Sequence, residues 1–124
     1  MRNEVFGEMA FSIGWKTKRE ICLFGKQYTI TVKLQASKAE DALPDVQQQA
    51  CLRYGAQEQE YLKSMETLMQ DFSAHAATRF TPRTLVFKKK GVCALLCDDA
   101  EDPDDGIAVC IIPQKKVMYQ DDFL

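Results

Sequence analysis

The chain has 124 residues, of which 46% are hydrophobic and 27% charged, and its formal net charge is −2. This length fits one domain with a core of its own, and the composition is ordinary for a soluble globular protein. No apolar run is long enough to cross a bilayer, and residues 1–8 carry acids where a signal peptide has basic and then apolar residues. We therefore expect a cytoplasmic protein with no membrane partner.

The first strongly patterned segment is a β-hairpin over residues 20–36. Gly25-Lys26 fits the centre of a type II′ turn, and the segment after it alternates apolar and polar side chains, as in a strand with one buried face. Before it, Phe11 to Trp15 alternates like a short strand, Thr17 to Arg19 is predicted as a polar turn, and residues 1–10 fit a tail or an edge strand. The face expected to meet the helices carries Tyr28, Ile30, Val32 and Leu34.

Two helices are predicted after a linker, residues 37–44. Asp45 is placed to cap a helix whose apolar residues repeat every four positions, and Gly55 is placed to end or bend it. A second helix, over residues 57–75, has an apolar stripe with charged residues opposite, which favours core packing over a groove for a partner. The stripe consists of Tyr61, Leu62, Met65, Leu68, Met69 and Phe72.

The last third of the chain contains two continuous apolar runs, residues 92–97 and 107–112. Runs of this length, rich in Val and Ile and bounded by Gly or Pro, are typical of strands buried on both faces. The Lys88-Lys89-Lys90-Gly91 segment predicts a hairpin turn before the first run. Segregated strands and helices predict an α+β fold with one domain, residues 1–124. We expect a mostly antiparallel sheet, made of the N-terminal hairpin and about four C-terminal strands, with one or two central helices packed on one face.

The loop between these runs, residues 98–106, holds six acids in nine residues. Its spacing is not that of an EF-hand: if Gly106 takes the sixth position, the third is Pro103 and the twelfth is Ile112. A divalent-ion site of another geometry and a solvated acidic turn are the alternatives. Lysines 88–90 lie close in sequence and are expected to compete with calcium for the acids.

Other chemistry has little support in the sequence. Cys93 and Cys97 face the same way on a strand but lie about 13 Å apart, so they cannot share a zinc ion without a bend. His75 is the single histidine, and no nucleophile elbow or glycine-rich phosphate loop is present. The short lysine run beside dense acids argues against nucleic acid. We expect no catalytic residue, no metal, no cofactor and no nucleic-acid partner, and we expect the five cysteines to be reduced thiols.

Several segments resemble a family of small uncharacterised bacterial domains. The likeness is carried by residues 81–85 (TPRTL), by Leu96-Cys97-Asp98 with residues 102–109 (DPDDGIAV), and by the ending at residues 120–124 (QDDFL). The family has no assigned reaction, and some of its members look like antitoxins of bacterial polymorphic toxin systems, so the resemblance implies an immunity protein. Where the family has an aromatic residue near the acidic loop, this chain has Asp98-Asp99-Ala100.

These observations predict a binding protein and not an enzyme. Clustered acids on a rigid hairpin suit a basic toxin domain, because charge complementarity speeds encounter and excludes wrong partners. The alternative is a regulatory or housekeeping domain that binds another protein or a divalent ion. The residues expected to contact the partner are Asp98, Asp99, Glu101, Asp102, Asp104, Asp105, Asp121 and Asp122.

Overall fold

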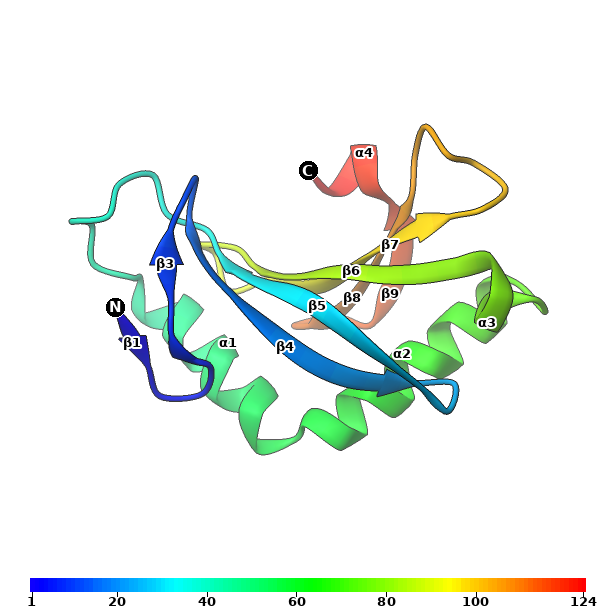
Figure 1. Ribbon diagram of the computed structural model, residues 1–124, viewed down its shortest axis with the longest axis horizontal. Coiled ribbons are helices and arrows are strands. Elements are labelled where there is room, and N and C mark those ends of the chain that lie inside the picture. Colours follow the sequence, from blue (N-terminus) through cyan, green and yellow to red (C-terminus); the bar gives the residue numbers. More distant parts are fainter.

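The computed structural model describes all 124 residues as a seven-stranded mixed sheet with helices against it (Figure 1). The strands lie in the order in which they occur in the chain: β3 (Ala10–Phe11), β4 (Trp15–Leu23), β5 (Lys26–Leu34), β6 (Phe80–Phe87), β7 (Cys93–Asp99), β8 (Ile107–Ile112) and β9 (Lys116–Tyr119). A separate two-stranded sheet pairs β1 (Arg2–Asn3) with β2 (Gly7–Glu8). The helices are α1 (Asp45–Ala56), α2 (Glu58–Phe72), α3 (Ala76–Arg79) and α4 (Gln120–Phe123).

The predicted α+β class is confirmed, although the sheet is not purely antiparallel. The strands β5 and β6 run parallel, since the chain leaves β5 and passes through α1, α2 and α3 before it enters β6 beside it. Every other neighbouring pair is antiparallel. None of the helices is long and apolar enough to span a membrane.

The predicted hairpin forms, with the expected face inward: Ile30, Val32 and Leu34 are buried. Its first strand is longer than predicted, because β4 begins at Trp15 and not at Glu20. The predicted polar turn at Thr17 to Arg19 is therefore wrong. Polar residues fit a strand here because the face turned away from α1 and α2 is open, and Arg19, on the helix side, forms a bidentate pair with Glu58.

The turn of this hairpin also differs from the prediction. Its central residues are Phe24 and Gly25, with φ of 53° and 73°, while Lys26 already pairs with Leu23. Positive φ at both positions is the pattern of a type I′ turn, not type II′. A left-handed phenylalanine is unusual, and here the backbone N–H of Phe24 donates a 2.6 Å hydrogen bond to the Glu66 carboxylate on α2. That bond ties the hairpin tip to the helix beneath it.

The two long helices lie close to their predicted positions. Pro44, and not Asp45, occupies the cap position of α1, and Asp45 makes no side-chain cap hydrogen bond. Because Asp45 is the first residue of the helix, its negative charge instead interacts favourably with the positive end of the helix dipole. Gly55 lies in the last turn of α1, where a Cβ would collide with the side chain of Val5. The helix α2 ends at Phe72, three residues earlier than predicted.

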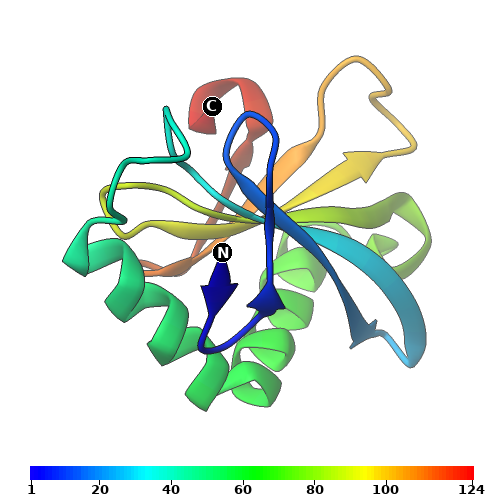
Figure 2. The same ribbon diagram turned by 60° about the vertical axis from the view of Figure 1, so that its left-hand side comes forward.

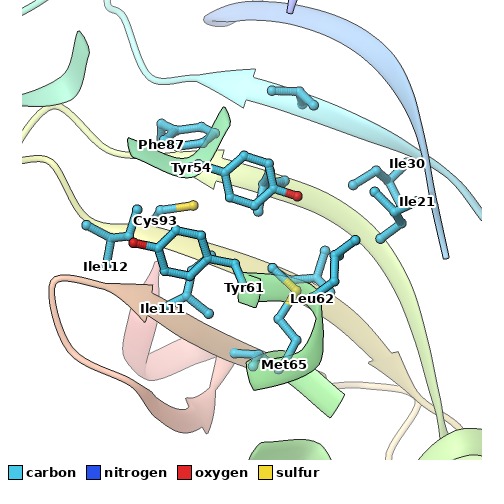
Figure 3. Packing of buried hydrophobic residues seen from close by; sticks show 14 of the residues in the cluster. Ile21, Ile30, Tyr54, Tyr61, Leu62, Met65, Phe87, Cys93, Ile111 and Ile112 are labelled. Carbon is cyan, nitrogen blue, oxygen red and sulfur yellow. The ribbon is translucent and has the colours of Figure 1, made fainter. Parts of the chain in front are cut away.

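The main core lies between these helices and the sheet (Figure 3). Tyr54 of α1 and Tyr61 of α2 stack with ring centroids 5.9 Å apart, and Tyr54 also meets Phe87 of β6 edge-on. The predicted stripe of α2 faces this core, with Tyr61, Leu62, Met65 and Met69 buried, Leu68 half-buried and Phe72 at the margin.

A smaller core lies on the opposite face of the sheet. The short helix α4 lies there (Figure 2), and Phe123 packs on Val86 and on the small side chains of Ala94 and Ala108. With a core on each face of the sheet, all six residues of β8 are buried, which confirms the expectation for its apolar run. Lys88 donates a hydrogen bond from Nζ to the backbone carbonyl of Phe123 and so holds α4 in place.

All five cysteines are free, and they differ in accessibility. Cys22 is exposed on β4, whereas Cys51, Cys93, Cys97 and Cys110 are buried. Burial raises the pKa of the Cys51 thiol to about 12 and that of Cys93 well above its ordinary value. A thiol must ionise to react, so burial and raised pKa both protect these groups.

We therefore predict that a thiol reagent at neutral pH modifies one cysteine of the folded protein quickly and the other four only after unfolding. Ellman titration before and after adding guanidinium measures both numbers. Replacing Cys22 with Ser should remove the fast phase alone. More than one fast thiol in the wild type would contradict the buried positions.

Candidate protein-binding surface

The acidic segment forms a tight loop that projects from one end of the sheet between β7 and β8 (Figure 1). Two backbone turns shape it, in which the N–H of Asp102 donates to the carbonyl of Asp99 at 3.1 Å and that of Asp105 to Asp102 at 3.2 Å. Asp102 and Asp104 are exposed and Asp105 is half-buried. The loop is thus a folded structure that presents carboxylates at defined positions.

Asp99 does not belong to the exposed set that the sequence predicted. Only 4% of it is exposed, and its two carboxylate oxygens accept hydrogen bonds from Arg79 at 2.9 and 3.0 Å. One oxygen also accepts from the N–H of Glu101. The β7 register directs Asp99 to the helix side of the sheet, where α3 supplies Arg79. Asp99 therefore anchors the loop from within, which corrects its assignment as a partner contact.

Arg79 was not recognised from the sequence. Its guanidinium also lies 3.2 Å from Glu101 and stacks over Phe80 at 5.0 Å from the ring centroid. An Asp and an Arg twenty residues apart carry no local signal of pairing, so only the packing of α3 against the loop reveals the anchor.

The Asp99–Arg79 pair should make the free energy of unfolding depend on pH. The hydrogen bonds from Arg79 outweigh burial and hold the pKa of Asp99 below its ordinary value. A carboxyl with a lowered folded-state pKa stabilises the fold above its unfolded pKa, and this contribution is lost as the pH falls through the folded-state pKa. We predict that Asp99→Asn lowers the urea midpoint at neutral pH, and that wild type and variant converge below about pH 4. Urea melts from neutral to acid pH measure this, and a difference that persists in acid would contradict the role of Asp99.

The C-terminal segment packs against the acidic loop, which the sequence alone could not show. The side-chain amide of Gln120 donates a hydrogen bond to the backbone carbonyl of Cys97 at 2.8 Å. The backbone N–H of Gln120 donates to the backbone carbonyl of Gly106 at 2.9 Å. Gly106 permits this approach, because a Cβ there would collide with the Cys97 carbonyl and the Gln120 amide. These contacts place Asp121 beside the loop, where its N–H donates to an Asp105 carboxylate oxygen at 3.4 Å.

The two acids near the C-terminus, Asp121 and Asp122, lie on different sides of α4. Asp121 lies with the loop, whereas Asp122 lies on the other side of α4 among Lys88, Lys90 and Lys116. A hollow of about 130 Å³ beside the loop is lined by acids, and we call the carboxylates around it the acidic ledge: Asp98, Asp102, Asp104, Asp105 and Asp121.

The acidic ledge is only weakly neutralised. Asp98 pairs with Arg83 at 2.7 Å, and both side chains are more than half exposed. No ion pair reaches Asp102, Asp104, Asp105 or Asp121. Lysines 88–90 do not compete for these acids as the sequence suggested, because their turn lies at the opposite end of β7. No group of three or more acidic, cysteine or histidine side chains is arranged to hold a metal ion.

Comparisons with family models, with curated proteins and with solved structures give no match. The likeness to small bacterial domains with antitoxin members therefore stays a prediction.

Proposed function

We propose that this protein binds and neutralises a cognate protein toxin through the acidic ledge. The observation that supports the proposal best is a set of carboxylates held beside a folded loop, of which only Asp98 has a cationic partner. Carboxylates this close repel one another, so the free protein carries an unfavourable charge load that a basic partner relieves. A structural turn between two strands needs far fewer acids.

The way the loop is anchored adds to this argument. The Asp99–Arg79 pair and the Gln120 contacts hold the loop from both ends, so little conformational freedom is lost when a partner binds. Exposed charges of one sign steer a partner of opposite sign and speed its association. On this proposal the protein acts in the cytoplasm as a binding protein and not as an enzyme, where its thiols stay reduced.

The experiment begins with the genes on either side of the one for this chain. Each neighbouring gene is expressed in a bacterial host, alone and together with this protein. The proposal predicts one neighbour that arrests growth alone and is tolerated when co-expressed, and a stable complex of the two purified proteins. If no neighbour is toxic, or if rescue occurs without a complex, the proposal is wrong.

The alternative is a regulatory domain that binds a non-toxic protein or a divalent ion through the same acids. Calorimetric titration with Ca²⁺ separates the ion from a protein partner, since oxygen ligands are those that Ca²⁺ prefers. Binding of Ca²⁺ that Asp102→Asn and Asp104→Asn abolish would favour the ion.

A further inference from the structure

Part of the open face of the sheet is left uncovered. The helix α4 covers β7 to β9, but no element lies over β4, β5 and the adjoining part of β6. A hollow of about 650 Å³ occurs here, bounded at one side by Leu124. Six of its nine lining residues are lysine or threonine, while Val86, Leu96 and Leu124 add apolar surface. We call it the lysine hollow after its basic side, which consists of Lys16, Lys18 and Lys33 with Thr31 and Thr84.

The strand register places the lysines against one another. Lys16 on β4 lies directly opposite Lys33 on β5, and Lys18 is the next residue on the same face. Like charges directly opposite each other destabilise a sheet. The Nζ of Lys18 donates to the Thr31 hydroxyl at 2.8 Å, and none of the three lysines forms an ion pair. The fold therefore accepts a repulsion that an anionic ligand would relieve.

The neighbouring residues preserve this charge. Asp98 projects from the same face of the sheet but is paired with Arg83, and Glu20 does not line the hollow. Gly14, with φ of 103°, packs against Lys33, since a Cβ there would lie 3.1 Å from Cε of the lysine and 2.9 Å from the Leu34 carbonyl. The Lys33 stem thus packs against the loop between β3 and β4.

We propose that the lysine hollow is a second binding surface, and that it takes an acidic polypeptide segment. Ammonium groups and threonine hydroxyls can donate to the carboxylates of such a segment, while the exposed Leu124 gives an apolar contact at the rim. No aromatic side chain lines the hollow, so the stacking platform that single-stranded nucleic acids use is missing. This surface has the opposite charge to the acidic ledge and lies on a different part of the sheet, so it goes beyond the function proposed above.

The test uses a fluorescein-labelled octaglutamate peptide, with octalysine and an oligothymidine of similar length as comparisons. Fluorescence anisotropy at low ionic strength should show octaglutamate bound most tightly. The double variant Lys16→Gln/Lys33→Gln should weaken binding about tenfold, since it removes two charged contacts. The control variant is Lys63→Gln/Lys115→Gln, which makes the same charge change at exposed positions outside the hollow. This control should change the affinity for octaglutamate less than about twofold.

A single substitution separates binding from structure. Lys16→Glu places opposite charges across β4 and β5, so we expect it to raise the melting temperature by about 2 to 4 °C and to abolish octaglutamate binding. Equal weakening by the test and control variants would show only a net-charge effect and overturn the proposal. Tighter binding of oligothymidine, lost on the same Lys16 and Lys33 substitutions, would identify a nucleic-acid site and also overturn it.

Discussion

Replacing Val32 with Asp is expected to unfold the protein. Val32 is fully buried in β5, paired with Thr17 on one side and with Leu85 on the other. Arg19, opposite Ile30 on the same face, is already bonded to Glu58, so the new carboxylate would be buried without a partner of its own or would have to take up a proton. The cost is several kcal/mol, which is comparable with the whole stability of a domain, about 5–15 kcal/mol.

A matched control lies one residue away. Thr31→Asp introduces the same side chain on the opposite face, where Lys18 already donates to the hydroxyl of Thr31. We expect circular dichroism to show a folded protein with a cooperative melt for Thr31→Asp and loss of the melt for Val32→Asp. A cooperative transition for Val32→Asp near the wild-type temperature would mean that the register of the hairpin is wrong.

The second large effect concerns association with the proposed toxin partner. Replacing Asp102, Asp104 and Asp105 with Asn keeps the size of each side chain and removes the charge of most of the acidic ledge. We expect the association rate at low salt to fall at least about tenfold, and the difference from wild type to shrink as salt screens the remaining charges. The melting temperature should stay the same or rise slightly, because repulsion within the loop is reduced.

Stopped-flow or surface-plasmon measurements over a salt series give this rate. The control Glu4→Gln/Glu40→Gln/Asp41→Asn makes the same change of net charge at exposed residues of the β1–β2 turn and of the segment between β5 and α1, which lie away from the β7–β8 loop (Figure 1). Its effect should be small at every salt concentration. An unchanged rate for the triple Asn variant, with the loop outside the interface of the complex, would reject the acidic ledge as the binding surface.

The elements that the sequence predicted well depend on short-range patterns. Alternation along β5 assigns its faces because successive side chains of any strand point to opposite sides. The apolar stripe of α2 and the unbroken run of β8 identify the buried sides in the same way. The first half of β4 has no such pattern at Thr17 to Arg19, because the helix-side residues Thr17 and Arg19 are polar like those of the outer face, and Arg19 is paired there with Glu58.

The candidate site was found only in outline, because a list of acids does not show which of them share a surface. Asp99 and Asp98 are neighbours in a strand, yet the first is buried against Arg79 and the second is exposed beside Arg83. Asp121 and Asp122 are separated in a similar way by the short helix α4. The grouping of Asp121 with the loop depends on Gln120 and Gly106, which are fourteen residues apart.

The sequence by itself determined the fold class, the hairpin faces, the buried strands and the position of an acid-rich loop, since each follows from residues close together in the chain. Only the tertiary structure decided that β5 and β6 pair in parallel, that Asp99 is an anchor, and that Lys16 and Lys33 face each other. These features depend on contacts between distant segments. Packing of the helices and strands, and not local preference, brings such segments together.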